Sequence, residues 1–209
     1  MHPLPLPDLP GARAEIVTPY PLDESSTPRV LFSPLALLPV QTHSTDVRIV
    51  TPDDRSSLIE ADAFITFTPT FPIGVVTADC VPIVISAPDI QAVAAIHAGW
   101  KGTIGGIVDR VIDLLCRNGA DPAQMHVAFG PSITPDNYEV SPDLAARFIQ
   151  AGFPESVTWT DNPDPRPRID LQDVNIRRLT RLGVSLPRIH PSPYSTFTSA
   201  RPDGTPLFP

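Results

Sequence analysis

The sequence contains little cysteine and no long apolar run. Its 209 residues include only two cysteines, which excludes a disulfide-stapled scaffold. No stretch reaches the roughly 18 apolar residues that a membrane-spanning helix needs, so we expect no association with a membrane. The first seven residues lack both the basic and the apolar segment of a secretory signal, and we therefore expect a cytoplasmic protein.

Lysine is almost absent, and basic residues are outnumbered by acidic ones. The chain carries 23 acidic and 15 basic residues, a net charge of −8, and Lys101 is its one lysine. Such a chain would repel a phosphodiester backbone, so we expect no nucleic-acid partner.

Glycine is scarce, whereas proline is abundant. The chain has 11 glycines and 28 prolines, so that proline makes up about 13% of the residues against roughly 5% in average soluble proteins. Proline and glycine together stay below the roughly 25–30% of low-complexity chains, and the hydrophobic content of 42% predicts a globular protein. The length of 209 residues favours a single domain. Nine prolines fall within residues 1–39, where we expect an N-terminal arm packed on a domain formed by residues 40–209.

Short apolar segments and one amphipathic segment predict a mixed α/β fold. Strands are expected near Ala14–Val17 and Val30–Phe32 in the arm, then at Val47–Val50, Ala63–Thr68, Ile73–Thr77, Ile83–Ile85, Ala92–Ile96, His126–Phe129 and Val157–Thr160. Apolar residues at three- and four-residue spacing predict a helix over Ile104–Leu115 that ends at Asn118–Gly119. Further helices are expected at Asp143–Ala151 and about Asp173–Leu182, and a surface loop at Asp161–Pro167.

Three polar segments with a histidine or cysteine lie at ends of predicted strands. His43 precedes a strand, Cys80 lies between two apolar strands, and His97 ends a strand just before the long helix. In α/β sheets, ligands collect at strand ends beside helix N-termini. Pro82 cannot donate to a sheet ladder, so it predicts a bend, bulge or edge that keeps the Cys80 thiolate accessible.

These three side chains suit more than one chemistry. Two imidazoles and a thiolate with one free position form a typical catalytic zinc site, although separations of 37 and 17 residues match no compact zinc motif. Cys80 and His97 could instead form a nucleophilic pair. A third possibility is structural, with Cys80 packed in the core and the histidines in loop caps. The residues alone leave all three open.

Four motifs, taken in order, resemble the signatures of the YfiH family. This family was first described as a multicopper polyphenol oxidase, or laccase-like, and is now regarded as purine nucleoside phosphorylase with adenosine deaminase activity. The resemblance runs from about Val40 to Val184 and includes Asp170–Leu171 and Asn175. The motifs are Gln41–Val47, Thr77–Pro82, His97–Gly102, and Gly130–Ile133 with Tyr138–Val140.

The resemblance implies a single-domain mixed β-sandwich with flanking helices in α/β/β/α layers. It also implies that His43, Cys80 and His97 hold one catalytic metal ion, zinc, with copper as the alternative. The implied activities are phosphorolysis of purine nucleosides, including methylthioadenosine, and deamination of adenosine. The expected partners are therefore purine nucleosides and phosphate, and we expect a monomer or weak homodimer.

Other residues of these motifs have expected roles. Lys101 lies in a glycine-bounded turn into a helix and is expected to hold phosphate. Asp79 is expected to orient a ligand or act as a general base, with a turn cap as the alternative. Asn175 and Tyr138 are expected to contact substrate.

The chain also departs from the family pattern. The family's Thr-Arg-Gly-Gly segment, whose arginine is a candidate phosphate contact, has no counterpart in Val17–Leu22. Two alternatives therefore stand beside the nucleoside enzyme. One is a cysteine hydrolase that uses Cys80 with His97 as base, and the other is a non-catalytic protein that binds a metal or a nucleoside.

Overall fold

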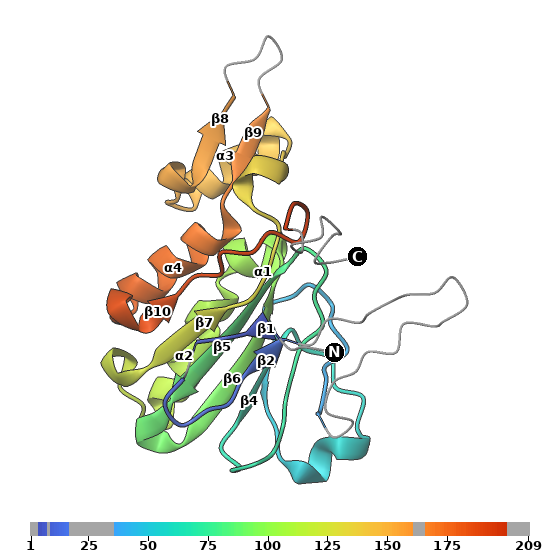
Figure 1. Cartoon of the computed structure of the whole chain (residues 1–209), viewed down its shortest axis with the longest axis vertical. Helices are drawn as coiled ribbons and strands as arrows, with labels where there is room; N and C mark the ends of the chain where they lie inside the picture. Colours follow the sequence, from blue (N-terminus) through green and yellow to red (C-terminus); the bar gives the residue numbers. More distant parts are fainter. Residues whose placement is uncertain (1–3, 8, 17–35, 161–165, 200–209) are drawn as a thin grey trace, which may run out of the picture.

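A six-stranded mixed sheet runs through the middle of the molecule (Figure 1). The structure is a computed structural model that describes residues 4–7, 9–16, 36–160 and 166–199. The strands are β3 (Val47–Ile49), β4 (Ala63–Thr66), β5 (Val81–Ala87), β6 (Ala92–Ala98), β7 (His126–Phe129) and β10 (Ile189–His190). Their order is β10-β7-β5-β6-β4-β3. The pairs among β4, β6, β5 and β7 are antiparallel, whereas β3 and β10 run parallel to β4 and β7.

The central strands are buried because their sequences are apolar at nearly every position. All four residues of β4 are buried, as are six of the seven residues of β6. Ile83, Ile85 and Ile96 are fully buried in one core with the helices. Strands with such sequences need cover on both faces of the sheet.

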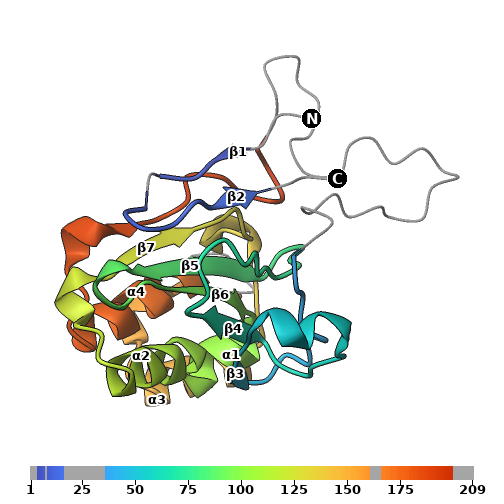
Figure 2. The same cartoon turned by 90° about the horizontal axis from the view of Figure 1, so that it is seen from below.

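Helices lie on one side of the sheet, and a small second sheet lies on the other (Figure 2). Helices α1 (Trp100–Gly105) and α2 (Ile107–Arg117) pack against β6, and α4 (Leu171–Arg181) packs against both helices. The opposite side carries β1 (Leu4–Pro5) and β2 (Glu15–Ile16), which pair antiparallel. The predicted mixed α/β single-domain fold is confirmed. Of the expected α/β/β/α layers, the described residues form the helical layer, the six-stranded sheet and this small sheet.

Helix α3 (Pro142–Gln150) and a two-stranded sheet project from one end of the molecule (Figure 1). The two strands, β8 (Val157–Trp159) and β9 (Pro167–Ile169), pair antiparallel. The helices predicted at Asp143–Ala151 and Asp173–Leu182 are therefore confirmed within two residues of their bounds. Among the described residues, no helix is both long enough and apolar enough to cross a membrane.

The N-terminal arm reaches the sheet through a few contacts. Leu9 is only 4% exposed, and the Ser86 hydroxyl of β5 donates to the Pro10 carbonyl at 2.5 Å. Of the two strands expected in the arm, the first corresponds to β2, while Val17 and Val30–Phe32 lie outside the described residues. The division between an arm over residues 1–39 and a domain over residues 40–209 stays a prediction.

Two segments differ from the sequence prediction. Ile73–Thr77 is not a strand, and only an isolated bridge joins Ile73 to Leu37. The Gln41 amide binds both backbone groups of Val76, at 2.8 and 2.7 Å, so a side chain takes the place of a neighbouring strand. The loop predicted at Asp161–Pro167 is also shorter at its end, because Pro167 begins β9; residues 161–165 lie outside the described chain.

Pro82 lies in a central strand, and the prediction of an edge was wrong. It is the second residue of β5, opposite His97 of β6, and its carbonyl accepts from the Gly130 N–H at 2.8 Å. In an antiparallel strand the nitrogen and carbonyl of one residue face the same neighbour. The proline nitrogen therefore faces the point where β7 has ended at Phe129, so no ladder bond is lost there.

The long amphipathic helix is broken by a glycine. Gly106 adopts a left-handed conformation, with φ of +79°, and separates α1 from α2. Its N–H still donates to the carbonyls of Gly102 and Thr103. After the break the side chains expected from the helical spacing are buried, except for Leu114, which is partly buried, whereas Ile104 before the break is also only partly buried. Periodicity could not show that Gly106 adopts a left-handed conformation.

We expect Gly106→Ala to destabilise the protein by about 1–3 kcal/mol, the usual cost of a residue held in an unfavourable backbone conformation. An added Cβ would also lie 2.5 Å from Oδ2 of Asp109, the carboxylate that pairs with Arg178. Urea denaturation measures the effect as a lower midpoint with an unchanged slope. An unchanged midpoint would contradict this account of the break.

Candidate metal centre

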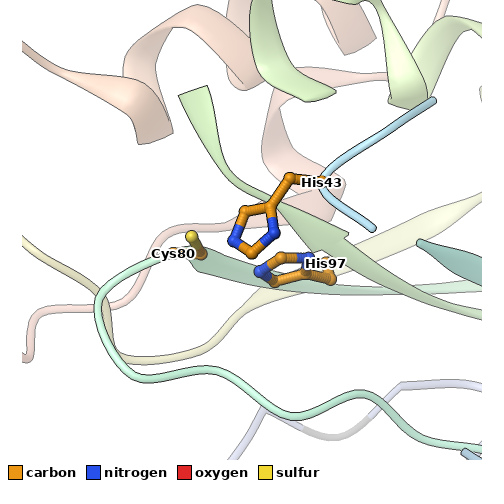
Figure 3. A group of neighbouring side chains, drawn as sticks. All are labelled: His43, Cys80 and His97. Atoms are coloured by element: carbon orange, nitrogen blue, oxygen red, sulfur yellow. The ribbon is translucent and has the colours of Figure 1, made fainter. Parts of the chain in front are cut away.

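The three predicted ligand residues meet at one end of the sheet. Because β5 and β6 are antiparallel, Cys80 just before β5 lies beside the end of β6, which carries His97. Strand β4 begins at the same end, and β3 runs parallel to it, so the loop with His43 that precedes β3 also arrives there. The expectation that strand ends gather these side chains is confirmed (Figure 3).

The geometry of this cluster suits a single metal ion. The potential ligand atoms of His43, Cys80 and His97 all lie within 4.8 Å of one another. The two imidazole rings are edge to face, with centroids 4.8 Å apart and planes at 82°. Donors around a tetrahedral zinc ion are about 3.5 Å apart, as follows from bond lengths of about 2.0–2.3 Å, so small side-chain rotations would complete the site.

Gly99 lies close to two of the three potential ligand residues. This residue has φ of −71° and ψ of 174°, a conformation open to any residue. A Cβ at this position would lie 3.0 Å from Sγ of Cys80 and 3.3 Å from Cδ2 of His43. The lack of a Cβ at this position therefore matters for the close approach of the Cys80 and His43 side chains and not for backbone strain.

Asp62 contacts two of the three potential ligand residues, and the sequence analysis missed it. It is 0% exposed and lies between Ala61 and β4. Its Oδ1 atom lies 2.8 Å from Nδ1 of His97 and accepts from the N–H of His43 at 3.0 Å. The signal in the sequence was a carboxylate between two alanines at the start of an apolar strand, since acidic residues are almost never fully buried without partners.

The acid–base properties of the site follow from burial and hydrogen bonds. Burial opposes ionisation of Asp62, but hydrogen bonds from His97, Ser44 and Thr42 outweigh it and lower the pKa of the carboxyl below its ordinary value. The pKa of the Cys80 thiol is raised, first by burial and then by the negative charges of Asp79 and Asp62. Without a cation the thiol therefore keeps its proton at neutral pH, and a metal ion would stabilise the thiolate.

Asp79 and Lys101 lie near the cluster but outside it. The Asp79 carboxylate is exposed and accepts from the Thr196 hydroxyl at 2.7 Å. Lys101 is exposed on α1, with its ammonium nitrogen 5.7 Å from the ring centroid of Trp100.

Asn175 and Tyr138 are both less accessible. Asn175 is 0% exposed, and its amide nitrogen donates to Oγ1 of Thr103 at 3.0 Å and to the Leu171 carbonyl at 2.8 Å. Burial, with a smaller effect of Cys80, raises the pKa of Tyr138 to about 12, so its phenol stays protonated. The hydrogen bonds of Asn175 to Thr103 and Leu171 place its side chain between α1 and α4.

Comparison with known proteins identifies the family. The family model described as multi-copper polyphenol oxidoreductase laccase matches residues 29–202. The chain belongs to this family. The crystal structure of the hypothetical protein YfiH from Bacillus licheniformis is similar with a TM-score of 0.71 and 28% identity, over 77% of this chain and 64% of that one. YlmD from Geobacillus stearothermophilus is similar with a TM-score of 0.68 and 31% identity, over 75% of this chain and 62% of that one.

Two curated relatives carry the names of enzymes. A purine nucleoside phosphorylase of Deinococcus radiodurans is 39% identical over 125 residues, which is 60% of this chain and 48% of that protein. Adenosine deaminase RL5, from an unknown prokaryotic organism, is 35% identical over 180 residues, which is 79% of this chain and 69% of that protein. The chain thus spans about half of the first relative and about two thirds of the second.

Proposed function

We propose that this chain is a metal-dependent purine nucleoside phosphorylase of the cytoplasm that also deaminates adenosine and cleaves methylthioadenosine. The observation that carries the proposal is the meeting of His43, Cys80 and His97, with donor atoms within 4.8 Å of one another. Relatives at 39% and 35% identity are named purine nucleoside phosphorylase and adenosine deaminase. The proposed substrates are therefore purine nucleosides, with phosphate or water as the second reactant.

Zinc is the ion that we propose for this centre. Two imidazoles and a thiolate leave one free position, as in catalytic zinc sites. Blue-copper centres share these ligands but add a weak axial group, often methionine. The methionines of this chain are Met1 and Met125, and Met125 is fully buried in the helical core. The described residues contain one group of three such ligands, which suits a single ion and not a multi-copper centre.

The two proposed reactions place different demands on the site. A bound zinc ion would supply a Lewis acid that lowers the pKa of a water molecule to about 7. Deamination needs water to replace the amino group at purine C6 as ammonia leaves, and phosphorolysis needs phosphate to displace the purine at ribose C1′. Because His43 is exposed and His97 is only 3% exposed, a nucleoside would reach the centre from the side of His43.

Neighbouring residues are proposed to assist these reactions. The exposed ammonium of Lys101 follows Gly99 by two residues and is proposed to hold phosphate, which would otherwise be repelled by an acidic chain. Asp79 is exposed beside Cys80 and is proposed as a proton acceptor. The protonated phenol of Tyr138 is proposed to donate a hydrogen bond to the substrate. The burial of Asn175 favours an indirect role, in which it binds Thr103, whose hydroxyl donates to the Ala98 carbonyl at the end of β6.

Incubation of the zinc-loaded protein with adenosine, with and without phosphate, tests the proposal. We expect inosine without phosphate, and adenine and hypoxanthine only when phosphate is present. Chromatography separates and quantifies these products. Absence of every product in both incubations would contradict the enzyme, and an ion bound under those conditions would support the non-catalytic alternative.

One observation favours the cysteine hydrolase as a second candidate. His97 contacts Asp62 through Nδ1 and lies beside Cys80. Nucleophilic triads have the same arrangement, in which a carboxylate orients a histidine and the histidine acts as base for the nucleophile. The raised pKa of Cys80 works against it, because the thiolate is the nucleophile. Removal of the metal separates the two candidates: the nucleoside enzyme loses activity on dialysis against a chelator, whereas a hydrolase would remain active and lose activity only when Cys80 is alkylated.

A further inference from the structure

We propose that Asp62 is a positioning residue that holds both histidines of the metal centre with one carboxylate. The proposal deepens the function above, because it rests on a metal ion bound by His43, Cys80 and His97. It concerns a residue that contacts two of the three ligands and is not a ligand of the cluster itself.

The burial of Asp62 requires an explanation. A carboxylate with no exposed surface loses its hydration, and it is tolerated only when protein donors replace the water. Within the part of the chain that the structure describes, Asp62 receives six such contacts, all from residues 42–44 and His97. They come from the N–H groups of Thr42, His43 and Ser44, the hydroxyls of Thr42 and Ser44, and Nδ1 of His97. The donors that make the charge tolerable therefore belong to the metal centre and its loop.

The first carboxylate oxygen sets the tautomer of His97. Oδ1 lies 2.8 Å from Nδ1, and an ionised carboxylate only accepts, so Nδ1 carries the proton. The other ring nitrogen, Nε2, is left with a lone pair for a metal ion. Carboxylates that bind the far nitrogen of a histidine ligand orient the ring and raise its basicity in many metal sites.

The same carboxylate holds the loop that presents His43. The backbone of His43 is left-handed, with φ of +57°, a conformation that a residue with a side chain adopts only when its surroundings require it. Its N–H donates to Oδ1, while the N–H groups of Thr42 and Ser44 donate to Oδ2 at 3.2 and 2.7 Å. Three successive N–H groups thus converge on one anion, which keeps His43 beside His97.

Asp62→Asn tests the proposal because an amide cannot serve both sets of donors. If the amide oxygen faces His97, the NH₂ group faces the N–H groups of Thr42 and Ser44. Donors then face donors, and the hydrogen bonds to the loop are lost. If the amide is turned, His97 must move its proton to Nε2 and loses the lone pair that would bind the ion. We expect zinc affinity, measured by competition with a chromophoric chelator, to fall about 10–100-fold, the usual effect of losing such an outer partner.

Asp46→Asn is the matched control, since it removes the same charge from the loop that Asp62 binds. The side chain of Asp46 is 52% exposed, and its one described ion pair is with Arg110 at 3.7 Å. We expect wild-type zinc affinity in this variant. Cobalt substitution adds a spectroscopic test: the visible bands of tetrahedral cobalt should be altered in Asp62→Asn and unchanged in Asp46→Asn. Equal affinities and spectra in both variants would overturn the proposal.

A measurement on the wild type keeps the proposal testable if Asp62→Asn does not fold. Nitrogen-15 NMR of the imidazoles in the metal-free protein reports which nitrogen carries the proton. We expect His97 to be protonated at Nδ1, and protonation at Nε2 alone would overturn the role of Asp62. A wild type that binds no divalent ion would instead contradict the proposed metal centre, while this tautomer measurement would still decide the role of Asp62.

Discussion

Replacing Cys80 with serine is expected to remove tight metal binding and, with it, the proposed nucleoside activities. A serine hydroxyl is nearly the size of the thiol but does not provide an anionic sulfur ligand at neutral pH. Loss of an outer partner already costs about 10–100-fold in affinity or activity, so loss of a ligand should cost more than that. Zinc content after gel filtration and the rate of adenosine conversion measure the two effects.

Cys116→Ser is the matched control for this prediction. Cys116 is the only other cysteine of the chain and lies on α2, outside the ligand cluster. We expect it to keep the zinc content and activity of the wild type, with no more than a modest loss of stability. If Cys80→Ser retained its zinc, the thiolate would not be a ligand.

Gly99→Ala is expected to impair metal binding while leaving the fold intact. The added methyl group would lie 3.0 Å from Sγ of Cys80, closer than real Cβ atoms normally approach another heavy atom. The backbone at Gly99 suits alanine, and such a substitution can stabilise a protein by about 0.4–1 kcal/mol through the unfolded state. We therefore expect lower zinc affinity in a protein that still folds, because this gain is offset by the movement of the Cys80 side chain away from the new methyl group.

Gly74→Ala provides the comparison for this variant. A Cβ at Gly74 would meet only the end of the flexible Leu38 side chain, at 3.1 Å. We expect its zinc affinity, measured by the same chelator competition, to equal that of the wild type. Full affinity in Gly99→Ala would show that the space beside Cys80 is not needed by the ion.

The placement of His43, Cys80 and His97 at strand ends could be predicted from local sequence, whereas their meeting at one site could not. Each lies beside an apolar segment with a clear strand pattern, and antiparallel pairing of β5 with β6 brings Cys80 and His97 together. His43 is positioned by the parallel pairing of β3 with β4, which the segments themselves did not specify. Separations of 37 and 17 residues do not indicate a metal site, and the prediction that the three residues bind one ion came from the resemblance to a family with the same motifs.

Other features could not be predicted because they depend on contacts distant in sequence. Asp62 acts through His97, which is 35 residues away, and through a loop 18–20 residues before it. Gly106 lies within an apolar pattern that suits one continuous helix, and the break occurs where both segments pack against β6 and α4. Ile73–Thr77 has the composition of a strand, but the Gln41 side-chain amide forms hydrogen bonds with the backbone N–H and carbonyl of Val76.

X-ray absorption at the zinc edge tests the central claim most directly, because it reports the atoms bound to the ion in the full chain. The account predicts one zinc ion per chain with two nitrogen neighbours at about 2.0–2.1 Å and one sulfur neighbour at about 2.3 Å. The sulfur signal should vanish in Cys80→Ser and persist in Cys116→Ser. A zinc ion with only oxygen and nitrogen neighbours in the wild type would contradict a centre built from His43, Cys80 and His97.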